Sequence, residues 1–199
     1  MLNVTRLLCG TSTPGDALRY GEKGSSPHHI PAPSAHFRPI VVWNVTRRCN
    51  LRCLHCYTSS NEHPAKDELN HNEAQAVVAD LAGFNVPVIL FSGGEPLIRE
   101  DVFDLMAQAA SLGVQPVLST NGTLIDAAMA DRLKSAGVKR VGISIDGLES
   151  TNDGFRQMKG AFRQAMDGIQ ASMEAGFRVS LRFTMTRHNA HEMDDIFAL

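Results

Sequence analysis

From residue 39 onward, segments typical of strands alternate with segments typical of helices, and this order constrains the fold more than any other feature. Strands are predicted where β-branched and other apolar residues gather, in residues 40–46, 86–92, 114–120, 139–146 and 178–186. Between them, apolar residues recur at helical spacing, which predicts helices over residues 73–84, 101–112, 126–136 and 161–175. A repeated strand–helix order is typical of a parallel sheet with right-handed connections, so the sequence predicts an α/β fold.

Polar residues or glycine occupy every second position of the last two predicted strands. In chain order these positions are Gly142, Ser144, Asp146, Ser180, Arg182, Thr184 and Thr186. Strands that helices cover on both faces are usually apolar on both. One face of this sheet is therefore expected to meet helices and the other something polar. A sheet with one solvated face satisfies the pattern, but we favour a partial parallel barrel whose interior holds a polar ligand.

The first 38 residues differ from the rest of the chain. They are rich in glycine, proline and short polar residues, and are predicted to form an N-terminal extension ahead of a core domain at residues 39–199. We expect the core domain to be incomplete at its C-terminus, because the sequence stops within a predicted helix after about five strands. That helix would leave its apolar side chains exposed, namely Met193, Ile196 and Phe197.

Composition excludes several kinds of partner. Nineteen basic and twenty-one acidic residues give a net charge of −2, and aromatic residues make up 6% of the chain. Neither a nucleic acid nor an anionic membrane surface is therefore expected as a partner. No apolar run approaches the roughly 18 residues of a membrane span, and the first residues lack the apolar stretch of a secretory signal. These features predict a cytoplasmic protein.

Three of the four cysteines are crowded into one segment directly after the first predicted strand. In a reducing compartment, the spacing of Cys49, Cys53 and Cys56 indicates a metal or redox site and not a disulfide framework. Three thiolates around a four-iron cluster would leave one iron open to a small molecule. A structural zinc would need a fourth ligand, and spacing alone leaves both metals open. The candidates for that ligand are His55, His63 and Cys9, the last of which is otherwise expected to be a free thiol.

The next three predicted strands also end in glycine-rich or polar loops. These loops are Ser92-Gly93-Gly94-Glu95-Pro96, Ser119-Thr120-Asn121-Gly122 and Ser144-Ile145-Asp146-Gly147. Each alone is compatible with an ordinary turn. Because parallel strands bring such loops to one edge of the sheet, together they predict a ligand site. The paired glycines would let the backbone approach a ligand, and the carboxylate of Glu95 could hold an ammonium group.

In combination, these motifs resemble those of the radical S-adenosylmethionine (SAM) enzymes. The resemblance covers residues 40–199 and is carried by CxxxCxxC after the first strand, Gly-Gly-Glu-Pro after the second and Ser-x-Asp-Gly after the fourth. It implies a partial parallel barrel of the (βα)6 type, here truncated after about five strands. It also implies an enzyme with a [4Fe–4S] cluster and SAM as cofactors, and a small electron-donor protein of the flavodoxin or ferredoxin type as partner.

The same resemblance implies roles for particular residues. Cys49, Cys53 and Cys56 would hold the cluster, and no further residue is assigned to catalysis. Contacts to SAM would come from Gly93, Gly94, Glu95, Asn121, Ser144, Asp146 and Arg156. Among these, the Gly-Gly-Glu segment would meet the methionine moiety and its amino group, Ser144 the ribose and Arg156 the carboxylate. Many members have an aromatic residue where this chain has His55, so Tyr57 would either take over that packing role or lie in the core.

Residues 8–21, 41–51 and 118–125 resemble the heme-biosynthesis branch of the family, most of all the didecarboxysiroheme deacetylases. This implies a siroheme-derived tetrapyrrole substrate that loses acetate side chains. Its carboxylates could meet Arg182 and one of Arg47 and Arg48, the other being expected in solvent. The alternatives are an enzyme of nitrite-reductase heme synthesis, an enzyme that decarboxylates iron-coproporphyrin, a peptide maturase and, from a different class, a non-catalytic zinc-binding module.

Overall fold

The computed structural model describes residues 38–199. The expectations for the N-terminal extension, including the free thiol at Cys9, fall on residues 1–37 and lie outside the described part of the chain. Within residues 38–199, no helix is both long and apolar enough to cross a membrane.

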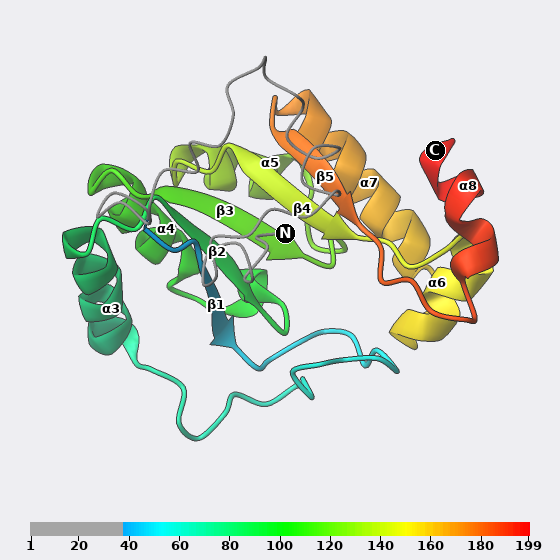
Figure 1. The fold of residues 1–199 in the computed structure, drawn as a ribbon, viewed down its shortest axis with the longest axis horizontal. Coiled ribbons are helices and arrows are strands. Elements are labelled where there is room, and N and C mark those ends of the chain that lie inside the picture. Colours follow the sequence, from blue (N-terminus) through cyan, green and yellow to red (C-terminus); the bar gives the residue numbers. More distant parts are fainter. Residues whose placement is uncertain (1–37) are drawn as a thin grey trace, which may run out of the picture. The chain divides into compact units, whose positions relative to one another are not determined.

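A parallel sheet forms the centre of the described domain. Its order is β1-β2-β3-β4-β5, so every strand pairs in parallel with its neighbour in the chain (Figure 1). This consecutive order is that of a barrel wall and not of a doubly wound sheet, in which the order reverses at a switch point. The predicted parallel α/β fold is confirmed. The strands are Val41–Thr46, Val88–Gly93, Gln115–Thr120, Arg140–Ser144 and Arg178–Arg182.

The four predicted helices are present as connections between successive strands. In chain order they are α3 (His71–Gly83), α4 (Val102–Ser111), α5 (Ala127–Ser135) and α7 (Ala161–Glu174). They form a row in which α4 packs on β3 and α7 packs on β4 and β5 (Figure 1). Two of them begin at side-chain caps that the sequence contains. Asn70 and Glu73 form a capping box on α3, and Asp126 accepts a hydrogen bond from the Met129 N–H of α5.

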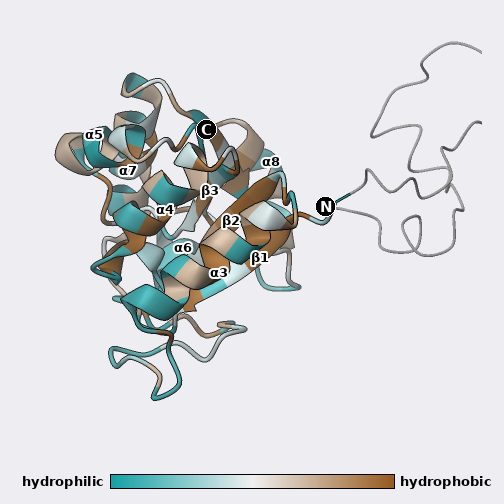
Figure 2. Ribbon diagram, turned by 90° about the vertical axis from the view of Figure 1, so that its left-hand side faces the viewer, coloured by the Kyte–Doolittle hydropathy of each residue, from teal (hydrophilic) through white to brown (hydrophobic). Residues whose placement is uncertain are grey.

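The core lies between this row of helices and the sheet. Figure 2 shows β1 and β2 as largely apolar, whereas α3 and α4 carry both apolar and polar residues, as amphipathic helices do. The outer, polar faces of the helices meet solvent. The largest fully buried side chains are Phe91, Ile89, Leu105, Met106, Leu118, Leu133, Ile143 and Ile145.

Two of the predicted strands end earlier than their sequence pattern suggests. β4 stops at Ser144 and β5 at Arg182, because the backbone N–H of Thr184 donates to the side chain of Asp146 instead of to a neighbouring strand. The apolar set of β5 is also less buried than expected. Leu181 is 43% exposed and Met185 is 59% exposed.

The pattern also missed α6 (Glu149–Arg156), since its residues ESTNDGFR show no apolar spacing. Two short 3-10 turns, η1 (Pro96–Ile98) and η2 (Ala190–Glu192), were likewise not predicted. The last helix, α8 (Met193–Phe197), was predicted to expose its whole apolar face, and for Ile196 this is wrong. Ile196 is buried in the core and Met193 is half-buried, whereas Phe197 is 82% exposed.

Candidate cofactor site at the carboxyl ends of the strands

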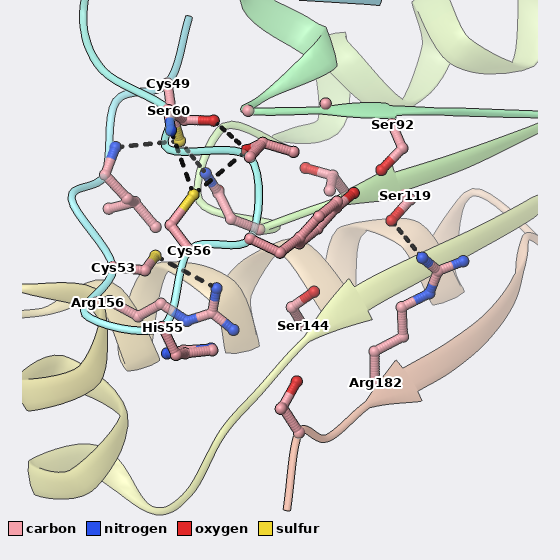
Figure 3. Close-up of a pocket in the computed structure, with 18 of the residues that line it drawn as sticks. Cys49, Cys53, His55, Cys56, Ser60, Ser92, Ser119, Ser144, Arg156 and Arg182 are labelled. Atoms are coloured by element: carbon pink, nitrogen blue, oxygen red, sulfur yellow. Dashed lines mark hydrogen bonds between the residues drawn. The ribbon is translucent and has the colours of Figure 1, made fainter. Parts of the chain in front are cut away.

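A cavity of about 350 Å³ opens where the carboxyl ends of the strands meet the loop that follows β1. Cys49, Cys53 and Cys56 line it together with polar residues from β2, β3, β4 and β5 (Figure 3). The expected polar interior of the sheet is therefore present. The strand-end residues that line it are Ser92, Gly93, Gly94, Ser119, Thr120, Asn121, Ser144, Asp146, Arg182 and Thr184.

The cysteine loop, residues 47–70, contains neither helix nor strand and is positioned by backbone hydrogen bonds. The Cys49 N–H donates to the Asn61 carbonyl at 2.7 Å, which closes the loop on itself. On its far side, the Leu54 N–H donates to the Phe155 carbonyl at 2.9 Å. Phe155 belongs to the last turn of α6, where carbonyl groups have no partner inside the helix. The missed helix α6 is thus one support of the cysteine loop.

Each thiol has a hydrogen-bond donor beside it. The Leu51 N–H donates to Cys49 Sγ at 3.4 Å and the Ser60 N–H to Cys56 Sγ at 3.3 Å. Nη1 of Arg156 lies 3.6 Å from Cys53 Sγ. Such donors stabilise a thiolate, which is the form that binds a metal.

Burial acts on two of these thiols in different degrees. Desolvation raises the pKa of Cys49 to about 11, although the hydrogen bond from Leu51 opposes the shift. A cation bound beside this thiol would favour its ionised form. Burial would also raise the pKa of Cys56, but hydrogen bonds from Thr58 and Ser60 outweigh it and lower that pKa below its ordinary value. The donor set of three soft sulfur ligands around a cavity suits a cluster of several irons. Among residues 38–199, no three His, Cys, Asp or Glu side chains are grouped closely enough to hold a single metal ion.

The paired glycines after β2 are required by the chain's own backbone. A Cβ at Gly93 would lie 2.3 Å from the carbonyl oxygen of Thr46, and a Cβ at Gly94 would lie 2.3 Å from that of Arg48. Both carbonyls belong to the segment that enters the cysteine loop. The Gly94 and Glu95 N–H groups donate to these same carbonyls at 2.8 Å. The paired glycines were predicted to let a ligand approach the backbone closely. In the structure, the segment that enters the cysteine loop makes this close approach, and both glycines also line the cavity.

Glu95 is the one predicted SAM contact that does not line the cavity. Its side chain is fully buried, and its carboxylate accepts hydrogen bonds from the Thr120 hydroxyl and from the N–H groups of Asn121 and Leu97. Burial raises the pKa of this carboxyl to about 7, although these hydrogen bonds oppose the shift. In this structure Glu95 ties the end of β2 to the end of β3.

Asn121 reaches from the end of β3 toward the first cysteine. Its Nδ2 donates to Oδ1 of Asn50 at 2.9 Å and lies 4.0 Å from Cys49 Sγ. Its Oδ1 accepts from the N–H and hydroxyl of Thr123. Asn121 is therefore a turn residue that also forms part of the cavity wall.

Asp146 joins the cysteine loop to α6. Its carboxylate pairs with the buried guanidinium of Arg156 and, at 3.0 Å, with Nε2 of His55. The His55 ring packs edge-on against Phe155 at a centroid distance of 5.2 Å, so a histidine here still makes an aromatic contact. Nδ1 of His55 and Nε of Arg156 are buried and have no hydrogen-bond partner among residues 38–199. Both residues line the cavity, and each thus places one unpartnered polar atom in its wall.

The opposite side of the cavity is formed by β3, β4 and β5. Ser144 of β4 stands beside Arg182 of β5 in the strand register, and the Arg182 guanidinium donates to the Ser119 hydroxyl of β3. In Figure 3 the cysteines and Arg156 lie on one side of the view and Arg182 on the other, with Ser144 between them. Ser92, Ser119 and Thr184 were not singled out as site residues, although their alternation with apolar positions marks the inner face of the strands.

The remaining expectations about side chains have mixed outcomes. Tyr57 is 75% exposed, so it does not lie in the core, and its hydroxyl donates to Oδ1 of Asn44. Arg47 is exposed, as expected for one of the two arginines. Arg48 does not line the cavity but a separate open groove beside His71 and Arg99.

A parallel barrel wall with three cysteines at its carboxyl end defines an α/β protein with a candidate cofactor site lined by thiols. The chain belongs to the radical SAM superfamily, whose family model matches residues 43–199. Members of this family use a [4Fe–4S] cluster and SAM. Three cysteine thiols lining one cavity, with buried polar atoms beside them that have no partner among residues 38–199, fit these cofactors.

The curated relatives include enzymes of heme synthesis. Fe-coproporphyrin III synthase of Methanosarcina barkeri is 48% identical over 200 residues, which is 100% of this chain and 50% of that protein. Pre-heme d1 synthase of Dinoroseobacter shibae is 44% identical over 162 residues, or 81% of this chain and 40% of that protein. The chain thus spans about half the length of the curated relatives it matches.

A solved structure shows the same fold. Native anSMEcpe with bound AdoMet, which is SAM, superposes with a TM-score of 0.67 over 80% of this chain and 47% of that chain. The two sequences are 20% identical, so the likeness concerns the arrangement of strands and helices.

Proposed function

We propose that this chain carries the SAM-cleaving core of a radical SAM enzyme of heme biosynthesis, and that its substrate is a siroheme-derived tetrapyrrole. One observation carries the proposal. The three cysteine thiols, Arg156 and the inner residues of four strands converge on a single cavity at the carboxyl end of a parallel sheet.

In this proposal Cys49, Cys53 and Cys56 hold the cluster, and the bound cluster supplies the electron that cleaves SAM. The other residues position SAM and keep water away. The Gly93 and Gly94 backbone faces the methionine moiety, and Arg156, already held by Asp146, offers its unpaired Nε to the SAM carboxylate. Ser144 contacts the ribose.

Asn121 completes the wall near Cys49. Glu95 acts as a positioning residue, because its carboxylate holds the N–H of Asn121 and the loop after β2 in place. We propose that its effect on SAM passes through these neighbours and not through direct contact.

Two observations favour a heme precursor as substrate. Relatives named for heme synthesis share more than two-fifths of their aligned residues with this chain. Loss of the acetate side chains from didecarboxysiroheme would leave methyl and propionate groups on the ring, which are the substituents of a coproporphyrin. The reaction proposed here is therefore consistent with the name of the first relative.

The partner and the location follow from the cofactor chemistry. Reduction of the cluster requires a small electron-donor protein of the flavodoxin or ferredoxin type, and free thiols of this kind persist in a reducing cytoplasm.

Synthesis of the nitrite-reductase heme is the second candidate function, supported by the similarity to pre-heme d1 synthase.

The test uses the full chain reconstituted without oxygen with iron and sulfide. We expect a brown protein with about four irons per chain. Incubation with SAM, a reductant and didecarboxysiroheme should yield 5′-deoxyadenosine and a tetrapyrrole lacking its acetate groups, measured by mass spectrometry. Cys53→Ala should lose the cluster, whereas Cys9→Ala, outside the CxxxCxxC motif, is the matched control and should retain it.

A colourless chain that binds one zinc would contradict the proposal and favour the zinc-binding module. Cleavage of SAM with no change to the tetrapyrrole would contradict the substrate alone. That result would direct attention to nitrite-reductase heme synthesis or to a peptide substrate.

A further inference from the structure

The inner face of the sheet carries a cationic side chain, Arg182 of β5. Arg182 is half-buried and lines the cavity, and among residues 38–199 no carboxylate lies within ion-pair distance of it. The other arginine of the cavity wall, Arg156, is already paired with Asp146. Burying an unpaired charge costs free energy unless a partner arrives.

The sequence of β4 makes room for this arginine. A Cβ at Gly142 would lie 2.6 Å from Nε and 3.0 Å from Cζ of Arg182, so only glycine leaves space for the guanidinium to lie against β4. The side chain crosses that strand and donates to the Ser119 hydroxyl of β3 (Figure 3). Three strands thus combine to hold one guanidinium in place, which lowers the entropy that a ligand must offset on binding.

Its place in the cavity is remote from the residues assigned to the cluster. Arg182 lies across the cavity from Cys53 and Arg156, beyond Ser144 (Figure 3). Burial lowers the pKa of Arg182, yet an arginine keeps its charge in proteins. A guanidinium with free N–H groups at this position matches a planar carboxylate.

We propose that Arg182, seated on Gly142 and held by Ser119, binds a carboxylate side chain of the tetrapyrrole substrate. This inference rests on the proposed function and deepens it by naming the residue that selects an acidic substrate. The anchor sits on the far wall of the cavity, so it would hold the ring by one acidic substituent while another part of the ring faces the SAM side.

The experiment compares three variants in the reconstituted full chain. Arg182→Gln removes the charge but keeps a polar, though shorter, side chain. Arg182→Lys keeps the charge, and Gly142→Ala displaces the guanidinium without changing its charge. Arg178→Gln is the matched control, since Arg178 is exposed at the opposite end of β5. The probes are didecarboxysiroheme and the same tetrapyrrole with its carboxylates converted to methyl esters.

Binding is measured by absorbance titration, and turnover by the KM and kcat for tetrapyrrole conversion. Arg182→Gln should raise the Kd and the KM for the acid by about tenfold to a hundredfold, the range expected for a charge-assisted hydrogen bond. Arg182→Lys should recover part of this loss, and Gly142→Ala should show a smaller loss in the same direction. SAM affinity and cluster absorbance should stay at the wild-type level in every variant, as should all values for Arg178→Gln.

The ester separates an anchor from a purely structural role. Esterification should weaken binding to the wild-type chain much more than binding to Arg182→Gln, because both changes remove the contact at Arg182. Equal affinity of the wild type and Arg182→Gln for the acid overturns the anchor while the proposed function stands. A wild-type chain that neither binds nor converts the acid contradicts the proposed function and overturns the anchor with it.

Discussion

At the residue scale, the chemistry of the site depends on groups whose ordinary behaviour burial has changed. Glu95 has no exposure to solvent and serves as an internal acceptor for three donors from the ends of β2 and β3. A carboxylate so placed acts on the site through the backbone it holds. Removal of its charge should therefore disturb the loops around the cavity.

Glu95→Gln is expected to lower the free energy of unfolding by about 1–3 kcal/mol, because its amide nitrogen would face backbone N–H donors. The difference from the wild type should depend on pH. The folded chain holds the Glu95 proton more tightly than the unfolded chain does. The contribution of protonated Glu95 to the stability of the wild type is therefore fully present below pH 4.5 and is lost as the pH rises to about 7. Urea unfolding of the reduced, cofactor-free chain at several pH values measures the free energy of unfolding of both proteins.

Across that range the wild type should lose stability relative to Glu95→Gln as the pH rises. A difference between the two proteins that is the same at pH 5 and pH 7 would show that burial does not raise this pKa.

At the scale of the elements, close backbone contacts position the loops that line the cavity. Gly168 in α7 packs on the turn after β3, where a Cβ would lie 2.2 Å from the carbonyl oxygen of Gly122. Gly122 itself has a φ of +82° and directly follows Asn121 of the cavity wall. The contact of α7 with this turn therefore places one wall of the site.

Gly168→Ala should destabilise the domain by about 1–3 kcal/mol, because the added methyl group has no room. Gly154→Ala is the matched control within α6, since a Cβ there would meet nothing within 4 Å. A helical glycine replaced without crowding should leave stability unchanged or raise it by about 0.5–1 kcal/mol. Thermal unfolding of both variants measures these effects, and equal midpoints would refute the packing role of Gly168.

At the scale of the whole domain, the cysteine loop is its least regular part. Residues 47–70 depend on a few backbone hydrogen bonds to the loop after β2 and to α6. A ligand that binds only the folded state stabilises it according to its concentration and affinity. The bound cluster should therefore stabilise this loop more than any other segment.

Removal of the cluster with a chelator should lower the melting temperature and expose residues 47–70 to protease. A free cluster concentration of about a hundred times its Kd would stabilise the folded state by about 2.7 kcal/mol. Limited proteolysis with mass spectrometry identifies the cleavage sites, with α7 as the internal reference. Cleavage of the loop at equal rates with and without the cluster would contradict this expectation.

Much of the architecture could be predicted because its signals are local. Apolar periodicity placed four helices and five strands within a few residues, and the Asn70 and Asp126 caps mark two helix starts. Helix α6 was missed because buried Asn152 and Arg156, and not apolar residues, form its inner face. Ile196 was assigned to an exposed face because its burial depends on tertiary packing, which the spacing of apolar residues within one helix does not reveal.

By itself, the sequence determined the order of elements, the position of the cysteine motif after β1 and the polar face of the last strands, because each depends on neighbouring residues. Only the tertiary structure decided which partners those residues have. It turned Glu95 away from the cavity, joined Asp146 to both His55 and Arg156, and laid Arg182 across Gly142 to Ser119. The physical reason is that burial and pairing depend on strand register and loop packing, which bring together side chains distant in the chain.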